Sequence, residues 1–480
     1  MNMPIDQYNK DRDAASMNAG SHEAGGLRAR LQKKICQYEV PDDPLIRERL
    51  EWFSDQKLGL MIHFGLYSQL GIKESHPLLD LSVWKGDPNW MRWQLPEHQN
   101  IREFKTDYVN LNKSFNPVRF DPDQWADIAC DAGFKYLLMT AKHHDGFCLW
   151  DTKTTDYRVT GPDCPYRYHR NADIVGSIYD AFRARGMAIS VYFSKSDWMS
   201  PYYWEPGYLL NGQTSSGPSY DPAKRPELWD KFKAYTHEQI RELTTRYGRV
   251  DCLWFDGGIK GLEIDKMVVE ARKTQPWLLS ADRSQGGQYE NFITPELEIP
   301  DWVLPVPWET CLCLGKKMEG ERYISFGYTY DQEYYSAAEV VHIFLEIACR
   351  GGNLALNIGP QPDGRFPARA MKSLQDLGRW MSLFGRGIYG ARPYAPFFAD
   401  FFRYMKKDGK IFVFRLYQEE EAIPAQLQFA LPDKVRSVSY MRTSQTLDFI
   451  HSESYVQIGL PTGMIGCKGM IADGFELTIT

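Results

Sequence analysis

Continuous apolar runs alternate with segments of helical periodicity over roughly the first four-fifths of the chain. The runs expected to be strands are 58–65, 136–141, 187–193, 251–256, 278–283 and 353–358. The helices expected between or after them are 172–185, 226–247, 262–274, 337–350 and 367–385. Parallel strands that are buried on both faces are apolar throughout, as most of these runs are. The repeated strand–helix units predict an α/β fold, a (β/α)8-like TIM barrel.

The helix that follows Phe120 shows how the sequence marks the ends of these elements. Asp121 can cap its first turn, and Pro122 suits the first helical position because its missing N–H would have no partner there. Gly133 is expected to end the helix in a left-handed conformation. This helix leads directly into the strand expected over 136–141.

The pattern changes after Gly387. Short segments follow at 410–417, 425–429, 437–440, 455–458 and 475–480, and several of them alternate apolar and polar residues. Half-buried antiparallel strands alternate in this way, so a C-terminal antiparallel β-sandwich is expected. We therefore divide the chain into an N-terminal leader (1–45, with a short basic helix near 27–34), a catalytic barrel (46–387) and the sandwich (388–480).

Composition excludes several classes of function. The 480 residues carry a net charge of -6 with both signs intermixed, which argues against a nucleic-acid or membrane partner. The nine cysteines lack the spacing of zinc or redox motifs, so we expect them to be reduced. The N-terminus shows no apolar signal core and no stretch is long enough to span a bilayer. We expect a cytoplasmic protein, or a secreted one if a signal segment has been removed.

Polar residues gather where the expected strands end. They are His63, His143, His144, Tyr192, Trp254, Asp256 and Arg283. Barrel enzymes keep their chemistry at the carboxyl ends of the strands. A carboxylate that ends an apolar strand is costly to bury without partners, which makes Asp256 the strongest candidate. Tyr192 and Trp254 would also suit an aromatic core.

Three chemistries are compatible with these residues. Glycoside hydrolysis needs two carboxyl groups, one of which must stay protonated at neutral pH. Glu290, Glu296 and Glu298 are candidates for that second group, and spacing alone does not choose among them. A metal-dependent barrel hydrolase is the second reading, although adjacent histidines diverge on a strand. A carbohydrate-binding barrel, or a very weak enzyme, that keeps the pocket but lacks a working acid is the third.

Several motifs then narrow the choice. The matching segments are 52–53, 59–65, 120–127, 142–150, 191–194, 253–257, 325–328 and 351–360. In this order they resemble glycoside hydrolase family 29, the α-L-fucosidases. The string His-His-Asp-Gly-Phe-Cys-Leu-Trp at 143–150 is the most specific of them. The resemblance covers about residues 50–385, the whole expected barrel.

The resemblance implies a retaining, exo-acting hydrolase that releases terminal α-L-fucose through a covalent intermediate. It implies that Asp256 is the nucleophile and that Glu296 is the acid/base, with Glu298 in reserve. The residues implied to hold the sugar are His63, His143, His144, Tyr192, Trp254, Arg283 and Trp308. Neither a metal nor another cofactor is expected.

The expected partner is a fucosylated oligosaccharide or glycoconjugate, and a homo-oligomer is left open. Asn89-Trp90 replaces a Glu-Trp pair of some relatives, so the linkage preference stays open too.

Overall fold

The computed structural model describes residues 26–79, 101–209, 216–283, 287–317 and 324–480. Its centre is a curled sheet of seven parallel strands in the order β5-β4-β3-β2-β1-β7-β6. These strands are β1 (Leu58–Ile62), β2 (Tyr136–Lys142), β3 (Ala188–Ser194), β4 (Cys252–Asp256), β5 (Leu279–Asp282), β6 (Glu309–Cys313) and β7 (Asn353–Ile358). Six of them match the apolar runs of the sequence, and β6 is the one that the pattern did not predict.

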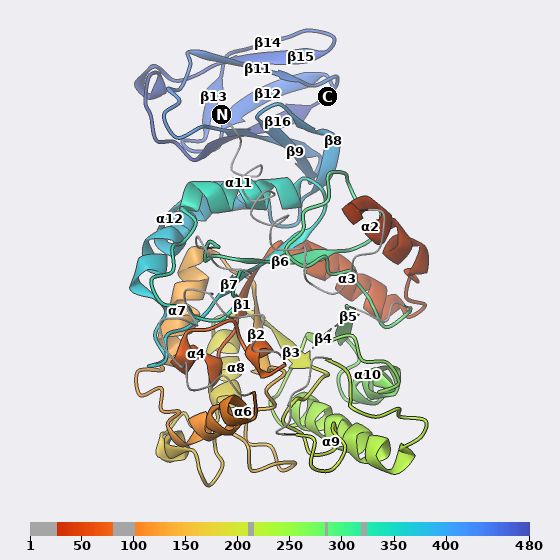
Figure 1. Ribbon diagram of the computed structural model, residues 1–480. Helices are drawn as coiled ribbons and strands as arrows, with labels where there is room; N and C mark the ends of the chain where they lie inside the picture. The colour runs from red at the N-terminus through yellow and green to blue at the C-terminus, as the bar shows by residue number, and fades with distance from the viewer. Residues whose placement is uncertain (1–25, 80–100, 210–215, 284–286, 318–323) are drawn as a thin grey trace.

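Helices surround this sheet (Figure 1). Those that follow strands are α7 (Pro122–Ala132), α8 (Ile174–Ala184), α9 (Pro226–Thr245), α10 (Ile264–Arg272), α11 (Ala337–Ala348) and α12 (Ala368–Phe384). Shorter elements are α4 (Tyr67–Leu70), α6 (Ile101–Asn110), η1 (His76–Leu78), η3 (Leu111–Lys113), η4 (Pro165–Tyr168), η5 (Gly385–Gly387) and η6 (Thr462–Met464). The expected ends of α7 are confirmed, because Asp121 caps it and Gly133 follows it in the left-handed conformation.

The eight-stranded barrel predicted from the sequence is seen only in part, because β5 and β6 do not pair directly. An irregular segment, 291–297, lies between them instead. The Asn291 amide donates to the Ser280 carbonyl on one side (2.8 Å), and the Glu309 amide donates to the Ile293 carbonyl on the other (3.0 Å). Pro295 lacks an N–H, and Leu297 has a positive φ of 55°. Neither feature suits a regular strand, which explains why this segment is not one.

Two N-terminal helices, α2 (Gly26–Gln37) and α3 (Pro44–Gln56), pack on the barrel near this gap (Figure 1). Phe53 of α3 stacks on Phe292 at 4.4 Å and contacts Tyr136, the first residue of β2. Helix α3 therefore covers the amino-terminal end of the strands. Residues 26–45, which we expected to form part of a leader, include α2, whose Leu31 is buried in the core cluster of the barrel. The domain bounds 1–45, 46–387 and 388–480 stay a prediction.

The C-terminal part consists of two antiparallel sheets. The larger has the order β13-β12-β16-β10-β9-β8, and the smaller has the order β11-β15-β14. The strands are β8 (Arg392–Ala399), β9 (Phe402–Lys407), β10 (Lys410–Leu416), β11 (Gln426–Ala430), β12 (Val435–Tyr440), β13 (Gln445–Leu447), β14 (Phe449–His451), β15 (Tyr455–Gly459) and β16 (Ala472–Ile479). Side chains of both sheets share one apolar cluster, for example Val413 with Phe429 and Val456.

Helix α11 joins the two parts of the molecule, with the C-terminal sheets above it in Figure 1. The buried Glu346 of α11 forms ion pairs with Arg350, which lies two residues beyond the end of this helix, and with Arg403 of β9. Trp380 of α12 donates to the carbonyl of Ala472 in β16 at 3.0 Å. Within the part of the chain that the structure describes, no helix combines the length and apolar character needed to cross a bilayer.

Candidate active site

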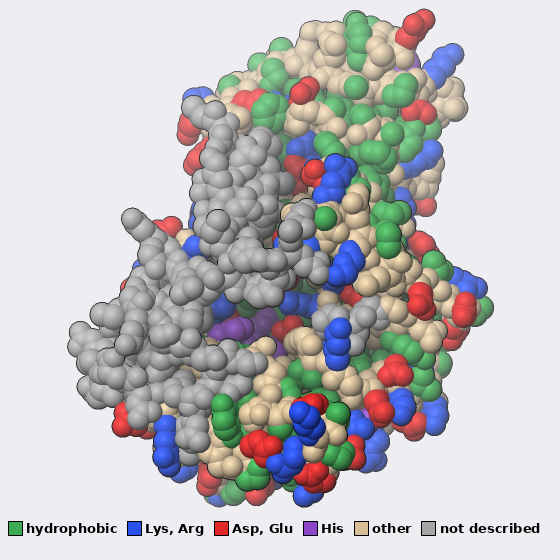
Figure 2. All heavy atoms as spheres, turned by 45° about the vertical axis from the view of Figure 1, so that its right-hand side comes forward, with side chains coloured by type: hydrophobic (Ala, Val, Ile, Leu, Met, Phe, Trp, Pro, Cys, Tyr) green, Lys and Arg blue, Asp and Glu red, His purple; other side chains and the backbone are tan. Residues whose placement is uncertain are grey.

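A cavity of about 610 Å³ lies at the carboxyl end of the strands. Figure 2 shows histidine side chains in a hollow, with acidic and basic side chains beside them. Seven of the nine predicted site residues line this cavity: His63, His143, His144, Tyr192, Asp256, Arg283 and Glu296. The strand ends therefore bring together all of these residues except Glu296, which lies in the irregular segment between β5 and β6.

Asp256 is contacted by three side chains of the cavity. The Tyr192 hydroxyl donates to its Oδ2, Arg283 Nη1 lies 3.2 Å from its Oδ1, and His144 Nε2 lies 3.6 Å from its Oδ2. Burial alone would raise the pKa of Asp256, but the Arg283 charge and the contacts from His144 and Tyr192 hold this pKa well below its usual range. Asp256 is therefore an ionised carboxylate at a fixed position.

Arg283 links the two candidate carboxyl groups. Its Nη1 faces Asp256, and its Nη2 donates to Glu296 Oε2. Glu298 also lines the cavity, where it pairs with Arg30 of α2. Glu290 does not line it and lies 3.5 Å from Lys34 Nζ instead. The geometry thus favours Glu296 as the second carboxyl group, with Glu298 as the neighbouring alternative.

His63 and His143 are arranged as neutral hydrogen-bonding groups. His63 Nδ1 lies 2.8 Å from Asn357 Oδ1, which can only accept, so this nitrogen carries the proton. Burial lowers the pKa of His63, which leaves its Nε2 as a free acceptor in the neutral ring. Burial and the neighbouring His144 hold the pKa of His143 well below its usual range. Its Nδ1 lies 2.6 Å from the Ser75 hydroxyl.

A buried lysine supports the loop that carries both histidines. Lys142 Nζ donates to Asp197 Oδ2 and to Gln239 Oε1, each at 3.0 Å. Gly146 turns the loop with a φ of +75°, and a Cβ at that position would come within 2.3 Å of the Asp197 carboxylate. Only glycine meets both requirements without displacing Asp197.

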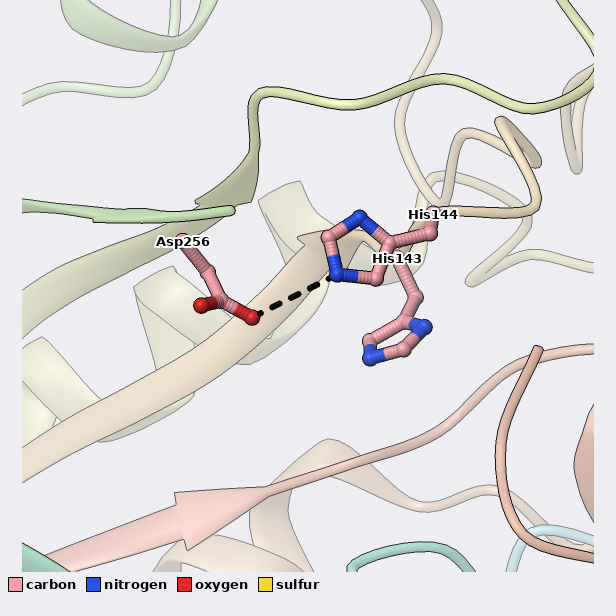
Figure 3. Close-up of side chains that lie close together, drawn as sticks. All are labelled: His143, His144 and Asp256. Atoms are coloured by element: carbon pink, nitrogen blue, oxygen red, sulfur yellow. Dashed lines mark ion pairs between the residues drawn. The ribbon is translucent and has the colours of Figure 1, made fainter. Parts of the chain in front are cut away.

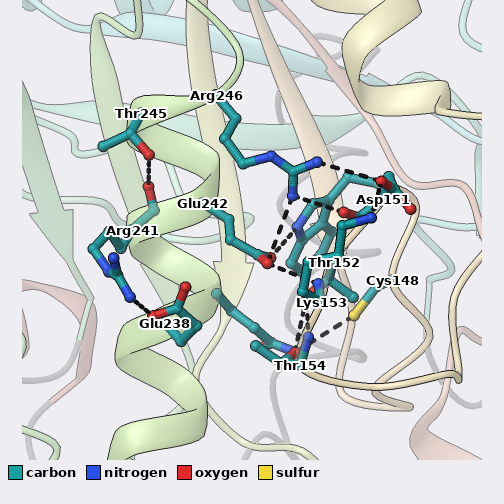
Figure 4. Close-up of polar contacts among 12 residues, drawn as sticks. Cys148, Asp151, Thr152, Lys153, Thr154, Glu238, Arg241, Glu242, Thr245 and Arg246 are labelled. Carbon is teal, nitrogen blue, oxygen red and sulfur yellow. Dashed lines mark hydrogen bonds and ion pairs between the residues drawn. The ribbon is translucent and has the colours of Figure 1, made fainter.

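Helix α9 holds the rest of this loop from the outside (Figure 4). Glu242 accepts from the Lys153 amide at 2.7 Å and from the Trp150 indole at 2.9 Å. Arg246 donates to the carbonyl of Asp151 at 2.7 Å. The segment after β2 is therefore tied to a helix that is distant in sequence.

One triad could in principle bind a metal ion. His143, His144 and Asp256 offer atoms that lie within 4.8 Å of one another (Figure 3). However, the Asp256 carboxylate already binds Arg283 and Tyr192, and the Arg283 guanidinium would lie beside any cation held there. His143 Nδ1 contacts Ser75. The donor set therefore suits a buried carboxylate with hydrogen-bonding partners better than a metal centre.

Comparison with known proteins agrees with this geometry. The family model described as Alpha-L-fucosidase matches residues 27–386. The chain belongs to the α-L-fucosidase family. It is a glycoside hydrolase that acts on α-L-fucosides.

Relatives include the tissue α-L-fucosidase of Macaca fascicularis, 28% identical over 74% of this chain and 72% of the relative. The human tissue enzyme is 27% identical with the same coverage. Among solved structures, α-L-fucosidase isoenzyme 1 from Paenibacillus thiaminolyticus is similar to this chain with a TM-score of 0.70 and 28% sequence identity. The match covers 91% of this chain and 100% of the Paenibacillus chain. Thermotoga maritima α-fucosidase in complex with fucose has a TM-score of 0.70 at 24% identity, with 92% and 98% covered.

Two tryptophans of this fucosidase that we expected to contact the sugar are not among the residues that line the cavity. Trp254 is buried below the cavity and donates to Glu309 Oε1 at 3.0 Å. Residues two apart on a strand share a face, but Trp254 lies one layer deeper than Asp256. Trp308 is also absent from the cavity lining, because its indole packs on Gly352 and donates to the Arg350 carbonyl at 3.2 Å.

Three other lining residues of the fucosidase were missed by sequence reasoning. Glu74 is buried and accepts from the amide of Gly327 (2.7 Å) and the hydroxyl of Ser325 (3.1 Å). His76 has its Nδ1 3.5 Å from Glu74, and Trp198 stacks on His144 at 4.6 Å. The sequence signal for Glu74 is weak because this residue lies in a loop between irregular elements. Asn89-Trp90, which we took as the replaced pair, lies outside the described residues.

Proposed function

We propose that this enzyme is a retaining, exo-acting α-L-fucosidase in which Asp256 is the nucleophile and Glu296 is the acid/base. The observation that carries this proposal is the bridge made by Arg283 between the two carboxyl groups. One of them is an ionised carboxylate with three side-chain contacts and a side chain that is 14% exposed, and the other is a glutamate whose side chain is 33% exposed. Retaining glycosidases need two carboxyl groups that flank the scissile bond, about 5–5.5 Å apart.

In the first step an oxygen of Asp256 bonds to the anomeric carbon of fucose as the bond to the leaving oxygen breaks. Glu296 transfers its proton to that oxygen, so the leaving group departs as an alcohol. In the second step Glu296 takes a proton from water, which attacks the anomeric carbon and releases Asp256. Each carboxyl group returns to its initial protonation state.

The remaining lining residues bind the sugar. His63 Nε2 is a free acceptor for a ring hydroxyl, whereas Tyr192 donates to the nucleophile itself. Arg283 keeps Asp256 ionised before attack and stays beside it when the carboxylate becomes an ester. Contacts that strengthen as charge develops on the ring contribute to the rate rather than to ground-state binding.

Relatives support this mechanism. A Bacteroides thetaiotaomicron α-L-fucosidase of family 29 has been solved as a trapped covalent intermediate with 2-fluoro-fucosyl fluoride, at a TM-score of 0.73 and 22% identity to this chain. The Thermotoga enzyme has been solved with fucose bound. We extend both properties, a covalent intermediate and fucose as the bound sugar, to this chain.

The finer architecture belongs to the same proposal. We infer that segment 291–297 takes the place of an eighth strand and closes the barrel, because it bonds to β5 and to β6. We infer also that the two C-terminal sheets form a β-sandwich around their shared apolar cluster. A cytoplasmic location, a fucosylated glycan as partner, and function without a metal or other cofactor complete the proposal.

A fluorinated fucoside tests the mechanism directly. The enzyme is incubated with 2-deoxy-2-fluoro-fucosyl fluoride, digested and analysed by mass spectrometry. We expect one added fluorodeoxyfucosyl group on the peptide that contains Asp256, and protection by excess fucose. A label on a different peptide, or turnover of fucosides without any trapped label, would contradict the assignment of the nucleophile.

A further inference from the structure

The N-terminal helix α2 forms one wall of the catalytic cavity. Arg30, Leu31 and Lys34 all line it, and their spacing places them on one face of the helix. Leu31 is 2% exposed although it belongs to a short helix near the start of the chain. The adjacent Lys33 is exposed and does not line the cavity. One face of this basic helix therefore lines the catalytic cavity.

This wall is bonded to the two segments that flank the acid/base. Lys34 Nζ donates to the main-chain carbonyl of Arg283 at 2.6 Å, and Arg283 holds Glu296. Arg30 forms an ion pair with Glu298, two residues beyond Glu296. Tyr38, just after α2, donates to the carbonyl of Asn291 at 3.0 Å. Helix α2 thus contacts the segment that carries Glu296 near both of its ends.

The position of Glu296 indicates which part of a substrate meets this wall. An acid/base must lie within hydrogen-bonding reach of the leaving oxygen. The surface next to Glu296, away from the histidines, is therefore where the leaving group lies. Leu31, Leu79 and Leu297 line this cavity with apolar surface, and α2 adds N–H donors. Apolar surface with a few donors suits the C–H face and hydroxyls of a sugar.

The charges on this wall are balanced. Arg30 faces Glu298, and Lys34 lies 3.5 Å from Glu290. An anionic leaving group would have to compete with these carboxylates for the same cations. The wall consequently fits a neutral saccharide better than a charged one.

We propose that α2 forms the leaving-group subsite for a neutral saccharide, and that Lys34 is a positioning residue that holds Arg283 and, through it, the acid Glu296. This proposal rests on the proposed function. Loss of Lys34 then slows hydrolysis of a substrate whose sugar leaving group must be protonated. It slows hydrolysis less when the leaving group needs no proton.

The experiment compares two substrates that differ in this requirement. One is α-L-fucosyl fluoride, whose small leaving group needs little acid assistance. The other is the fucosyl disaccharide that the wild-type enzyme hydrolyses fastest among α1-2, α1-3, α1-4 and α1-6 isomers. The variants are Lys34→Met, its conservative counterpart Lys34→Arg, Leu31→Ala, and the exposed neighbour Lys33→Met as matched control.

We expect Lys34→Met to lower kcat/KM for the disaccharide about tenfold more than for the fluoride, as the loss of one hydrogen-bonded contact would. In Lys34→Arg the kcat/KM for the disaccharide relative to that for the fluoride should stay close to the wild-type ratio. Lys33→Met should behave as wild type. Leu31→Ala should raise KM for the disaccharide more than it lowers kcat. If Lys34→Met does not fold, Leu31→Ala decides by the same ratio.

Equal losses on both substrates for Lys34→Met and Leu31→Ala would overturn the proposal, since they would indicate a structural role only. Stronger turnover of a disaccharide with a carboxylated leaving sugar than of its neutral counterpart would overturn the neutral subsite. Failure of the wild-type enzyme to cleave fucosyl fluoride would instead contradict the proposed function, so the two failures are distinguishable.

Discussion

The two carboxyl groups of the active site stand on different kinds of structure. Asp256 ends β4, a regular strand paired on both sides, and its side chain is 14% exposed. Glu296 lies in the irregular segment between β5 and β6, and its side chain is 33% exposed. Asp256 has contacts from three side chains, whereas Arg283 is the ion-pair partner found for Glu296 among the described residues.

This difference follows from the chemistry of the two groups. A nucleophile must stay ionised and aimed at one carbon, which a strand in the middle of a sheet can ensure. An acid/base must exchange protons with a leaving group and then with water, so it needs contact with solvent. The greater exposure of the Glu296 side chain gives that access. The following four changes test this contrast between the two sides.

The largest effect is expected from Asp256→Gly, because it removes the group that forms the covalent bond. Activity should fall by about 10⁴- to 10⁶-fold, as expected for removal of a nucleophile. Added azide should restore turnover by entering the vacated space and should give a fucosyl azide of inverted configuration. Product analysis by NMR checks this, and near wild-type activity without azide would contradict it.

A smaller loss, about 10²- to 10³-fold on natural disaccharides, is expected from Glu296→Ala. Aryl fucosides with good leaving groups should be affected much less, because they need little protonation. Glu298→Ala is the matched control, and its loss should be smaller on both substrates. If Glu298→Ala showed the strong dependence on leaving group and Glu296→Ala did not, Glu298 would be the acid.

Arg283→Met should shift the pH dependence of kcat/KM, because Arg283 contacts the nucleophile Asp256. Arg283 lowers the pKa of Asp256, so its loss raises that pKa. Less of the carboxylate is then ionised at low pH, and the acid limb of the kcat/KM profile should move up by about 1 to 3 pH units. Arg283→Lys keeps the charge and should move it less. An unchanged acid limb in Arg283→Met would show that Asp256 does not control it.

The smallest effect concerns Glu309 in the barrel interior. Burial raises its pKa to about 7, and it accepts hydrogen bonds from Tyr136 and Trp254. Between its ordinary pKa near 4.3 and this value, the folded protein binds a proton that the unfolded chain does not. Stability should therefore decrease as pH rises, by about 1.4 kcal/mol per pH unit.

Glu309→Gln removes the titrating carboxyl group. The contribution of Glu309 to the pH dependence of the free energy of unfolding should therefore disappear. The measurement is unfolding by urea at pH 5 and pH 7, with wild type and variant in parallel. We expect wild type to lose roughly 2 to 3 kcal/mol more than the variant over this interval. Parallel losses would mean that Glu309 is ionised in the folded protein at pH 5 as well.

The nucleophile side was largely predictable from the sequence. Its strands are apolar throughout, a pattern that few other structures share, and the end of each strand is marked by a polar residue. Asp256, Tyr192 and the two histidines after β2 could therefore be placed at one rim from this pattern alone. The pattern could not tell the rim from the layer below, so it left open whether Trp254 lies in the cavity wall or in the core.

The acid/base side was not predictable in the same way. Strand β6 reads Glu-Thr-Cys-Leu-Cys, and its charged first residue is buried only because Tyr136 and Trp254 from other strands bind it. Segment 291–297 has no periodicity at all, so Glu296 and Glu298 could be named but not separated. The partners that distinguish them, Arg283 and Arg30, are 13 and 268 residues away in sequence.

The sequence by itself determined the parallel strands, most of their helices and the residues at the strand ends, because local periodicity records which faces are buried. Only the tertiary structure decided which carboxyl group lies beside Asp256, what fills the gap between β5 and β6, and that helix α2 forms a wall of the cavity. These features depend on contacts between segments far apart in the chain, and such contacts leave no periodic trace in either segment.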